Sequence, residues 1–197
     1  MKRLCLFLAA TFLLCATSIK AQVAVFATYE DFTNKKYTSV DYSDATFDQY
    51  SADVRGLKKS KAWGHKEYWG VAFNNMLYRK ISGDVAVYGS VARVYEVGEY
   101  ILYYEYGVRS VGKEGTQVGF AHAYISKDLN SKVYMVDRRR IRDIAKKDPA
   151  FEKLAEYVEK ADRKKDIKDL ITEYITQSPS HKEIKDLIPV LPAGPSH

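Results

Sequence analysis

The hydrophobic period of the chain changes once, near residue 136, and this change constrains the fold more than any other feature. Residues 23–136 contain short runs rich in valine and aromatic residues, broken by Gly, Asn and Asp, which is typical of strands and turns. From Asp137 onward, apolar residues recur at spacings of three and four, which indicates amphipathic helices. We therefore predict an α+β fold, in which C-terminal helices pack on an antiparallel sheet that is curled, barrel-like or sandwich-like.

Local signals place the expected elements. Asn74-Asn75 predicts a tight hairpin turn, and Thr28 predicts the N-cap of a short helix over residues 29–35. Residues 38–62 carry few aliphatics and predict either an irregular excursion or one weakly patterned strand pair. The expected strands cover residues 23–27, 69–73, 76–81, 85–88, 92–97, 99–106, 117–124 and 133–136.

Four helices are expected in the second region. The first carries Ile141 and Ile144, and the second begins at the N-cap Asp148 and runs on to about residue 161. The third covers residues 167–175, and a capping box of Ser180 with Glu183 predicts a last short helix. The expected organisation is therefore a segment 1–21, a β region 22–136, a helical region 137–190 packed on the sheet, and a loose tail 191–197.

The segment 1–21 has the pattern of a cleaved export signal. Lys2 and Arg3 precede an apolar run over residues 4–16, and small and polar residues follow as far as Ala21. Neither cysteine follows a small residue, so the lipoprotein motif is absent, whereas an uncleaved anchor remains the alternative. We expect a protein exported to the periplasm or the cell exterior, with no transmembrane segment in the mature chain.

Cleavage after Ala21 changes the composition on which a functional argument rests. Three basic residues and no acid are removed, so the net charge of +6 falls to +3. Both cysteines are removed as well, which excludes disulfides, thiol nucleophiles and cysteine-ligated metals from the mature chain. The arginines 138, 139, 140 and 142 lie between Asp137 and Asp143 and predict a solvated helix face with local ion pairs, so nucleic acid is not an expected partner.

The sequence contains no convincing catalytic motif, and we expect no cofactor, metal site or catalytic residue. An enzyme, a hydrolase or metal-dependent protein using His65, Glu67 and His122, remains the alternative, because two of these residues share a strand face. Candidate ligand-binding residues are Trp63, Tyr68 and Trp69, which fall within seven positions.

Tyrosine is the one compositional excess, with sixteen in the chain. Alternation places Tyr100, Leu102, Tyr104 and Tyr106 on one strand face, and Ile101, Tyr103 and Glu105 on the other. The first set predicts the sheet surface on which the helices pack; a binding surface is the alternative.

Three segments carry a resemblance to known proteins: residues 25–32 (VFATYEDF), residues 69–79 (WGVAFNNMLYR) and residues 94–100 (VYEVGEY). Together with the Ala21-Gln22 junction, they resemble a loose group of small exported proteins of unknown function from Bacteroidota-type bacteria. The resemblance implies no activity and no site residue. From the residues themselves we predict a non-catalytic binding or protein-interaction module of the cell envelope, with an envelope protein or a glycan as partner.

Overall fold

The computed structural model describes residues 22–41, 45–47, 52–54, 68–81, 91–111 and 115–190. The predicted export signal, the tail, the strand over residues 85–88, and Trp63, His65 and Glu67 lie outside these ranges. None of the helices in the described part of the chain has both the length and the apolar composition to cross a membrane.

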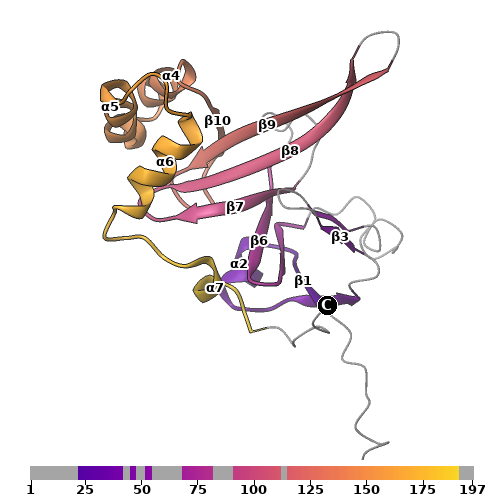
Figure 1. Cartoon of the computed structure of the whole chain (residues 1–197). Helices are drawn as coiled ribbons and strands as arrows, with labels where there is room; N and C mark the ends of the chain where they lie inside the picture. The colour runs from indigo at the N-terminus through magenta and orange to yellow at the C-terminus, as the bar shows by residue number, and fades with distance from the viewer. Residues whose placement is uncertain are drawn as a thin grey trace, which may run out of the picture.

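Within the described part of the chain, eight strands form one antiparallel sheet in the order β10-β9-β8-β7-β6-β5-β1-β2 (Figure 1). The sheet is not closed, because β10 and β2 are its two edges. The α+β prediction is therefore confirmed. The strands are β1 Gln22–Phe26, β2 Thr38–Asp41, β5 Gly70–Phe73, β6 Met76–Lys80, β7 Val91–Val97, β8 Ile101–Val111, β9 Thr116–Ser126 and β10 Tyr134–Val136.

The first half of the sheet follows the predicted local signals. Helix α2 (Tyr29–Thr33) begins after Thr28, whose side-chain oxygen accepts a hydrogen bond from the Asp31 backbone at 3.0 Å. Asn74 and Asn75 have φ angles of 46° and 58°, as a tight turn between paired strands requires. Within residues 38–62, β2 joins the main sheet, and β3 (Ala45–Phe47) pairs with β4 (Ala52–Val54) in a separate ribbon.

Strands β8 and β9 are longer than predicted. They pair over eleven residues each, from Ile101 opposite Ser126 to Val111 opposite Thr116. Strand pairing beyond the hydrophobic run accounts for the difference, because backbone hydrogen bonds continue where the side-chain pattern no longer indicates burial. Figure 1 shows the far end of this hairpin projecting away from the helices.

The helices also begin close to their sequence signals, with one exception. Asp148 caps the short 3-10 helix η2 by accepting from the Ala150 backbone at 3.2 Å. The predicted capping box of α7 is wrong, because the Ser180 hydroxyl bonds to Ser178 at 2.8 Å and Glu183 makes no capping bond. The helical elements are α4 Arg140–Lys147, η2 Pro149–Phe151, α5 Glu152–Lys160, α6 Ile167–Thr176 and α7 Ile184–Leu187.

The start of strand β8, where the structure describes its side chains, has a hydrophobic core on each face. Tyr100, just before the strand, and Leu102 pack under the helices with Phe151 and Ile171 of η2 and α6. Ile101 and Tyr103 face the other core, which also contains Phe26, Phe32, Leu77 and, from the α7 end, Ile188. The predicted alternation and the predicted packing surface are both confirmed for residues 100–104, while the side chain of Tyr106 lies outside the description.

Among the residues whose burial the structure describes, four tyrosines are fully buried, Tyr78, Tyr100, Tyr103 and Tyr124, and each hydroxyl has a partner. Tyr78 donates to the Met76 sulfur at 3.4 Å, and Tyr124 donates to the Glu105 carboxylate. Tyr103 bonds to the Ser126 hydroxyl at 2.9 Å and accepts from Arg79 at 2.8 Å. Burial of these rings therefore does not leave an unsatisfied polar atom at their tips.

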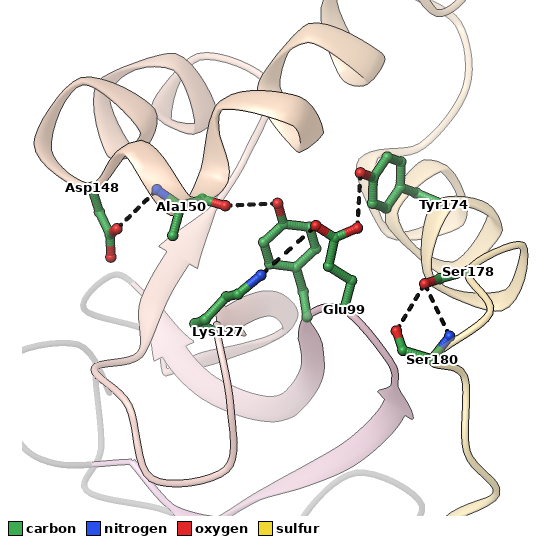
Figure 2. Close-up of polar contacts among 8 residues, drawn as sticks. Glu99, Lys127, Asp148, Ala150, Tyr174, Ser178 and Ser180 are labelled. Carbon is green, nitrogen blue, oxygen red and sulfur yellow. Dashed lines mark hydrogen bonds and ion pairs between the residues drawn. The ribbon is translucent and has the colours of Figure 1, made fainter.

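The Tyr100 hydroxyl joins the sheet to the helical layer. It donates to the Ala150 carbonyl at 2.7 Å, while the ring lies 5.2 Å from that of Phe151. Beside it, Figure 2 shows Glu99 between Lys127 and Tyr174 of α6. The Glu99 carboxylate lies 3.8 Å from the Lys127 ammonium and accepts a hydrogen bond from the Tyr174 hydroxyl at 3.2 Å. Gly98 leaves room for this junction, since a Cβ there would lie 2.8 Å from the Ile175 side chain.

We expect Tyr100→Phe to lower the free energy of unfolding by about 1–2 kcal/mol, because the Ala150 carbonyl loses its donor while the packing of the ring is kept. Urea unfolding followed by circular dichroism measures the difference. Tyr37→Phe is the matched control, since its half-buried ring packs 6.2 Å from Phe26 at the edge of the other core. Equal losses in both variants would contradict the role of the Tyr100 hydroxyl.

The buried tyrosines also predict a loss of stability in alkali. Burial raises the pKa of Tyr100, and burial together with the Glu105 carboxylate raises the pKa of Tyr124. The unfolded chain ionises near pH 10, so the contribution of each group is complete below that pH and falls as the pH rises above it. Thermal unfolding between pH 8 and pH 11 should show this fall, with a smaller slope above pH 10 in Tyr124→Phe. Identical slopes for the two proteins would refute the assignment.

Candidate functional site

A groove of about 340 Å³ lies where the start of α6 meets strands β8 and β9 and the end of β10, and we call it the α6 groove. Its apolar lining comes from Ala121, Ala123, Met135, Val136 and Ile167. Its polar side chains are those of Tyr104, Asp137, Arg140, Asp166 and Lys168. His122 also borders the groove, but it alternates with Ala121 and Ala123 along β9, so its side chain lies on the opposite face of the sheet. The volume falls within the range of pockets that hold small organic ligands.

Two of the polar groups are fixed by helix starts. Asp137 accepts from the backbone N–H groups of Arg139 and Arg140, both at 2.8 Å, in the turn that begins α4. Asp166 caps α6 by accepting from the Lys168 backbone at 2.7 Å. Because each cap uses Oδ1, both carboxylates are held in a defined orientation at the groove.

Charges of both signs meet in the α6 groove. The second oxygen of Asp137 pairs with Arg140 at 3.3 Å. Lys168 places its ammonium 4.5 Å from the ring centre of Tyr104 and 4.3 Å from that of Tyr95, which holds this cation by two cation–π contacts. With two cations and two carboxylates, the groove offers hydrogen-bond donors and acceptors over an apolar floor without a large net charge.

His122 is the one residue of the enzyme alternative that lies in the described part of the chain. Its ring centre is 6.3 Å from that of Tyr124, and its cross-strand partner is the buried Glu105, so its side chain lies on the sheet face opposite the α6 groove. Among the described residues, no group of three His, Cys, Asp or Glu side chains could hold a metal ion. The convergence of His122 with His65 and Glu67 stays a prediction.

The predicted binding residues Tyr68 and Trp69 occupy opposite sides of the sheet, as consecutive residues of an extended chain do. Trp69 packs against Phe32 at 4.7 Å and Tyr29 at 5.4 Å, beside the core that faces α7. Tyr68 belongs to a different cluster and lies under the ammonium of Lys80 at 5.7 Å. Tyr68 and Trp69 do not share one surface, and a site including Trp63 stays a prediction.

Arg79 anchors a buried polar network that the sequence did not indicate. Its side chain is 9% exposed, and it donates to the Tyr103 hydroxyl at 2.8 Å and to the Ser131 carbonyl at 3.0 Å. Ser126 continues the network by donating to the Asp128 carbonyl at 2.6 Å. The network ties β6 and β8 to the loop after β9, and we assign it a structural role.

The arginines around α4 largely follow their prediction. Arg140 pairs with Asp137, and Arg142 pairs with Glu159 of α5. Arg138 instead donates to carbonyl oxygens at and beyond the end of α5, those of Val158, Asp162 and Lys165. A guanidinium with several donors suits the unpaired carbonyls of a helix end, and its contacts fix the C-terminal end of α5 beside α4.

Comparison of the chain with protein-family models, with curated proteins and with solved structures gives no match. The resemblance to small exported proteins of Bacteroidota-type bacteria therefore stays a prediction, as does export to the periplasm or the cell exterior. The candidate site rests on the geometry of the α6 groove alone.

We expect Trp69→Ala to lower the free energy of unfolding by roughly 3 kcal/mol, because the indole fills space between Phe32 and Tyr29. Tyr68→Ala is the comparison variant, because it removes the neighbouring ring, which packs on the opposite side of the sheet. Chemical unfolding measures both. A Trp69→Ala protein as stable as the wild type would show that the indole is not part of the core.

Proposed function

We propose that the mature chain is an exported, non-catalytic binding module of the cell envelope, and that its α6 groove holds an uncharged sugar unit of a glycan. The observation that carries the proposal is the convergence of fixed donors and acceptors, from Asp137, Arg140, Asp166 and Lys168, over an apolar floor.

The chemistry of the groove favours a polyhydroxyl ligand. Sugar hydroxyl groups both donate and accept, so they can satisfy carboxylates and cations within the same site. The apolar side chains Ala121, Ala123, Met135 and Ile167 suit the C–H face of a sugar ring. Because the charges of Asp137 and Asp166 offset those of Arg140 and Lys168, a ligand of large net charge has no advantage in this groove.

The rigidity of the groove supports binding as well. Asp137 is already bonded to the turn before α4, Asp166 already caps α6, and Lys168 is already held against two tyrosine rings. A ligand that binds here does not need to order these side chains, which reduces the entropic cost of association. This site replaces Trp63, Tyr68 and Trp69 as our leading candidate, because Trp69 packs into a core.

The test uses three aspartates whose side chains accept from backbone N–H groups at helix starts. We expect the double variant Asp137→Asn with Asp166→Asn to bind neutral oligosaccharides at least tenfold more weakly, because two acceptors of the groove lose their charge. Asparagine still caps a helix, so the fold is retained. Binding is measured by titrating a panel of fluorescent neutral di- to tetrasaccharides and envelope-derived glycans.

Asp148→Asn is the matched control, because Asp148 caps η2 outside the α6 groove. This variant should bind as the wild type does. The proposal fails if no sugar of the panel binds the wild type, or if Asp148→Asn weakens binding as much as the double variant does. Capture of an envelope protein in place of glycans would instead support a protein-interaction module.

A further inference from the structure

A second groove, of about 800 Å³, lies between α4 and α5, and we call it the basic groove. Its cationic lining comes from Arg138, Arg139, Arg142, Lys146 and Arg163. Asp143 and Glu159 are the two carboxylates among its lining residues. The basic groove therefore carries an excess of three positive charges, in contrast to the balanced α6 groove.

Only part of this positive charge is neutralised within the described part of the chain. Arg142 pairs with Glu159, and Lys146 lies 3.6 Å from Asp143. Arg138 bonds to backbone carbonyls, which orient its guanidinium but leave its charge uncompensated. Arg139 and Arg163 are exposed and form no ion pair with any described residue. Their guanidinium groups can each make two parallel hydrogen bonds to a carboxylate, sulfate or phosphate.

We propose that the basic groove binds the anionic groups of an acidic polysaccharide whose uncharged units occupy the α6 groove. This inference rests on the proposed function and names the chemical class of its glycan. The start of α4 contributes to both sites: Asp137 and Arg140 line the α6 groove, while Arg138 and Arg139 line the basic groove. A chain-like ligand can therefore contact both grooves across one helix start.

The internal carboxylates of the basic groove favour this occupant over a more densely charged one. Asp143 and Glu159 interrupt the cations, so a ligand with closely spaced phosphates would meet like charges as well as opposite ones. A polysaccharide carries fewer charges per unit length and hydroxyl groups between them, and these hydroxyls can bond to the two carboxylates. The size of the groove, well above the needs of a single ion, also suits a polymer segment.

The experiment compares two double variants that each remove two positive charges. Arg139→Gln with Arg163→Gln alters the basic groove, whereas Lys153→Gln with Lys185→Gln alters exposed positions of α5 and α7 that do not line it. We expect the first pair to weaken binding of polygalacturonate at least tenfold and to reduce the dependence of the affinity on salt concentration. The second pair should change the affinity less than twofold, and binding of neutral oligosaccharides should be unchanged in both.

The controls separate this inference from the function on which it rests. Equal losses in the two double variants would mean a general effect of net charge and would overturn the inference. Binding of polyglutamate or of phosphatidylglycerol vesicles as tight as that of polygalacturonate would overturn the assignment to a polysaccharide. If polygalacturonate fails to bind while neutral oligosaccharides still do, the basic groove is not a site and the α6 groove stands. If polygalacturonate binds through Arg139 and Arg163 but neutral oligosaccharides do not, the anion site stands and the sugar assignment of the α6 groove fails.

Discussion

The structure depends on the burial of the first five residues of β8, Ile101 to Glu105, between two cores, because the buried polar groups among them need partners inside the protein. Leu102 and Ile101 fill the two cores with apolar atoms. Tyr103 and Glu105 add polar atoms on the side of Ile101, where they form hydrogen bonds with Arg79, Ser126 and Tyr124. An unpaired buried hydroxyl or carboxylate would cost on the order of 1–3 kcal/mol or more, so these pairings restrict which arrangements of the strands are compatible with folding.

The same requirement positions the helices. The Tyr100 hydroxyl reaches the Ala150 carbonyl, while Glu99 accepts from Tyr174, so η2 and α6 are tied to the first residues of the β8 region (Figure 2). Arg138 then links α4 to the end of α5. Once these contacts fix the helical layer, the start of α6 lies over Tyr104 and the α6 groove forms beside it. The proposed site is thus a product of the packing of α6 on the sheet.

The two grooves differ in charge although α4 lines both. In the α6 groove, each cation has a carboxylate or aromatic partner, which suits an uncharged ligand that exchanges hydrogen bonds. In the basic groove, cations outnumber carboxylates, which suits an anion. Asp137 and Asp166 serve both the fold and the proposed site, since their bonds to backbone N–H groups orient the carboxylates before any ligand arrives. Such double use explains why neither residue stands out in the sequence as a binding residue.

The sequence by itself determined the α+β class and the alternation that buries Tyr100 and Tyr103 on opposite faces. It also determined the Asn74-Asn75 turn and the helix caps at Thr28 and Asp148. These features follow from local periodicity and local backbone hydrogen bonding. It did not indicate Arg79 with Tyr103, Glu105 with Tyr124, or Lys168 on Tyr104, which lie 19 to 64 positions apart. Nor could it show that Trp69 packs beside Phe32. Only the tertiary structure decided these contacts and both grooves, since side chains distant in the chain meet only once strand order and helix placement are fixed.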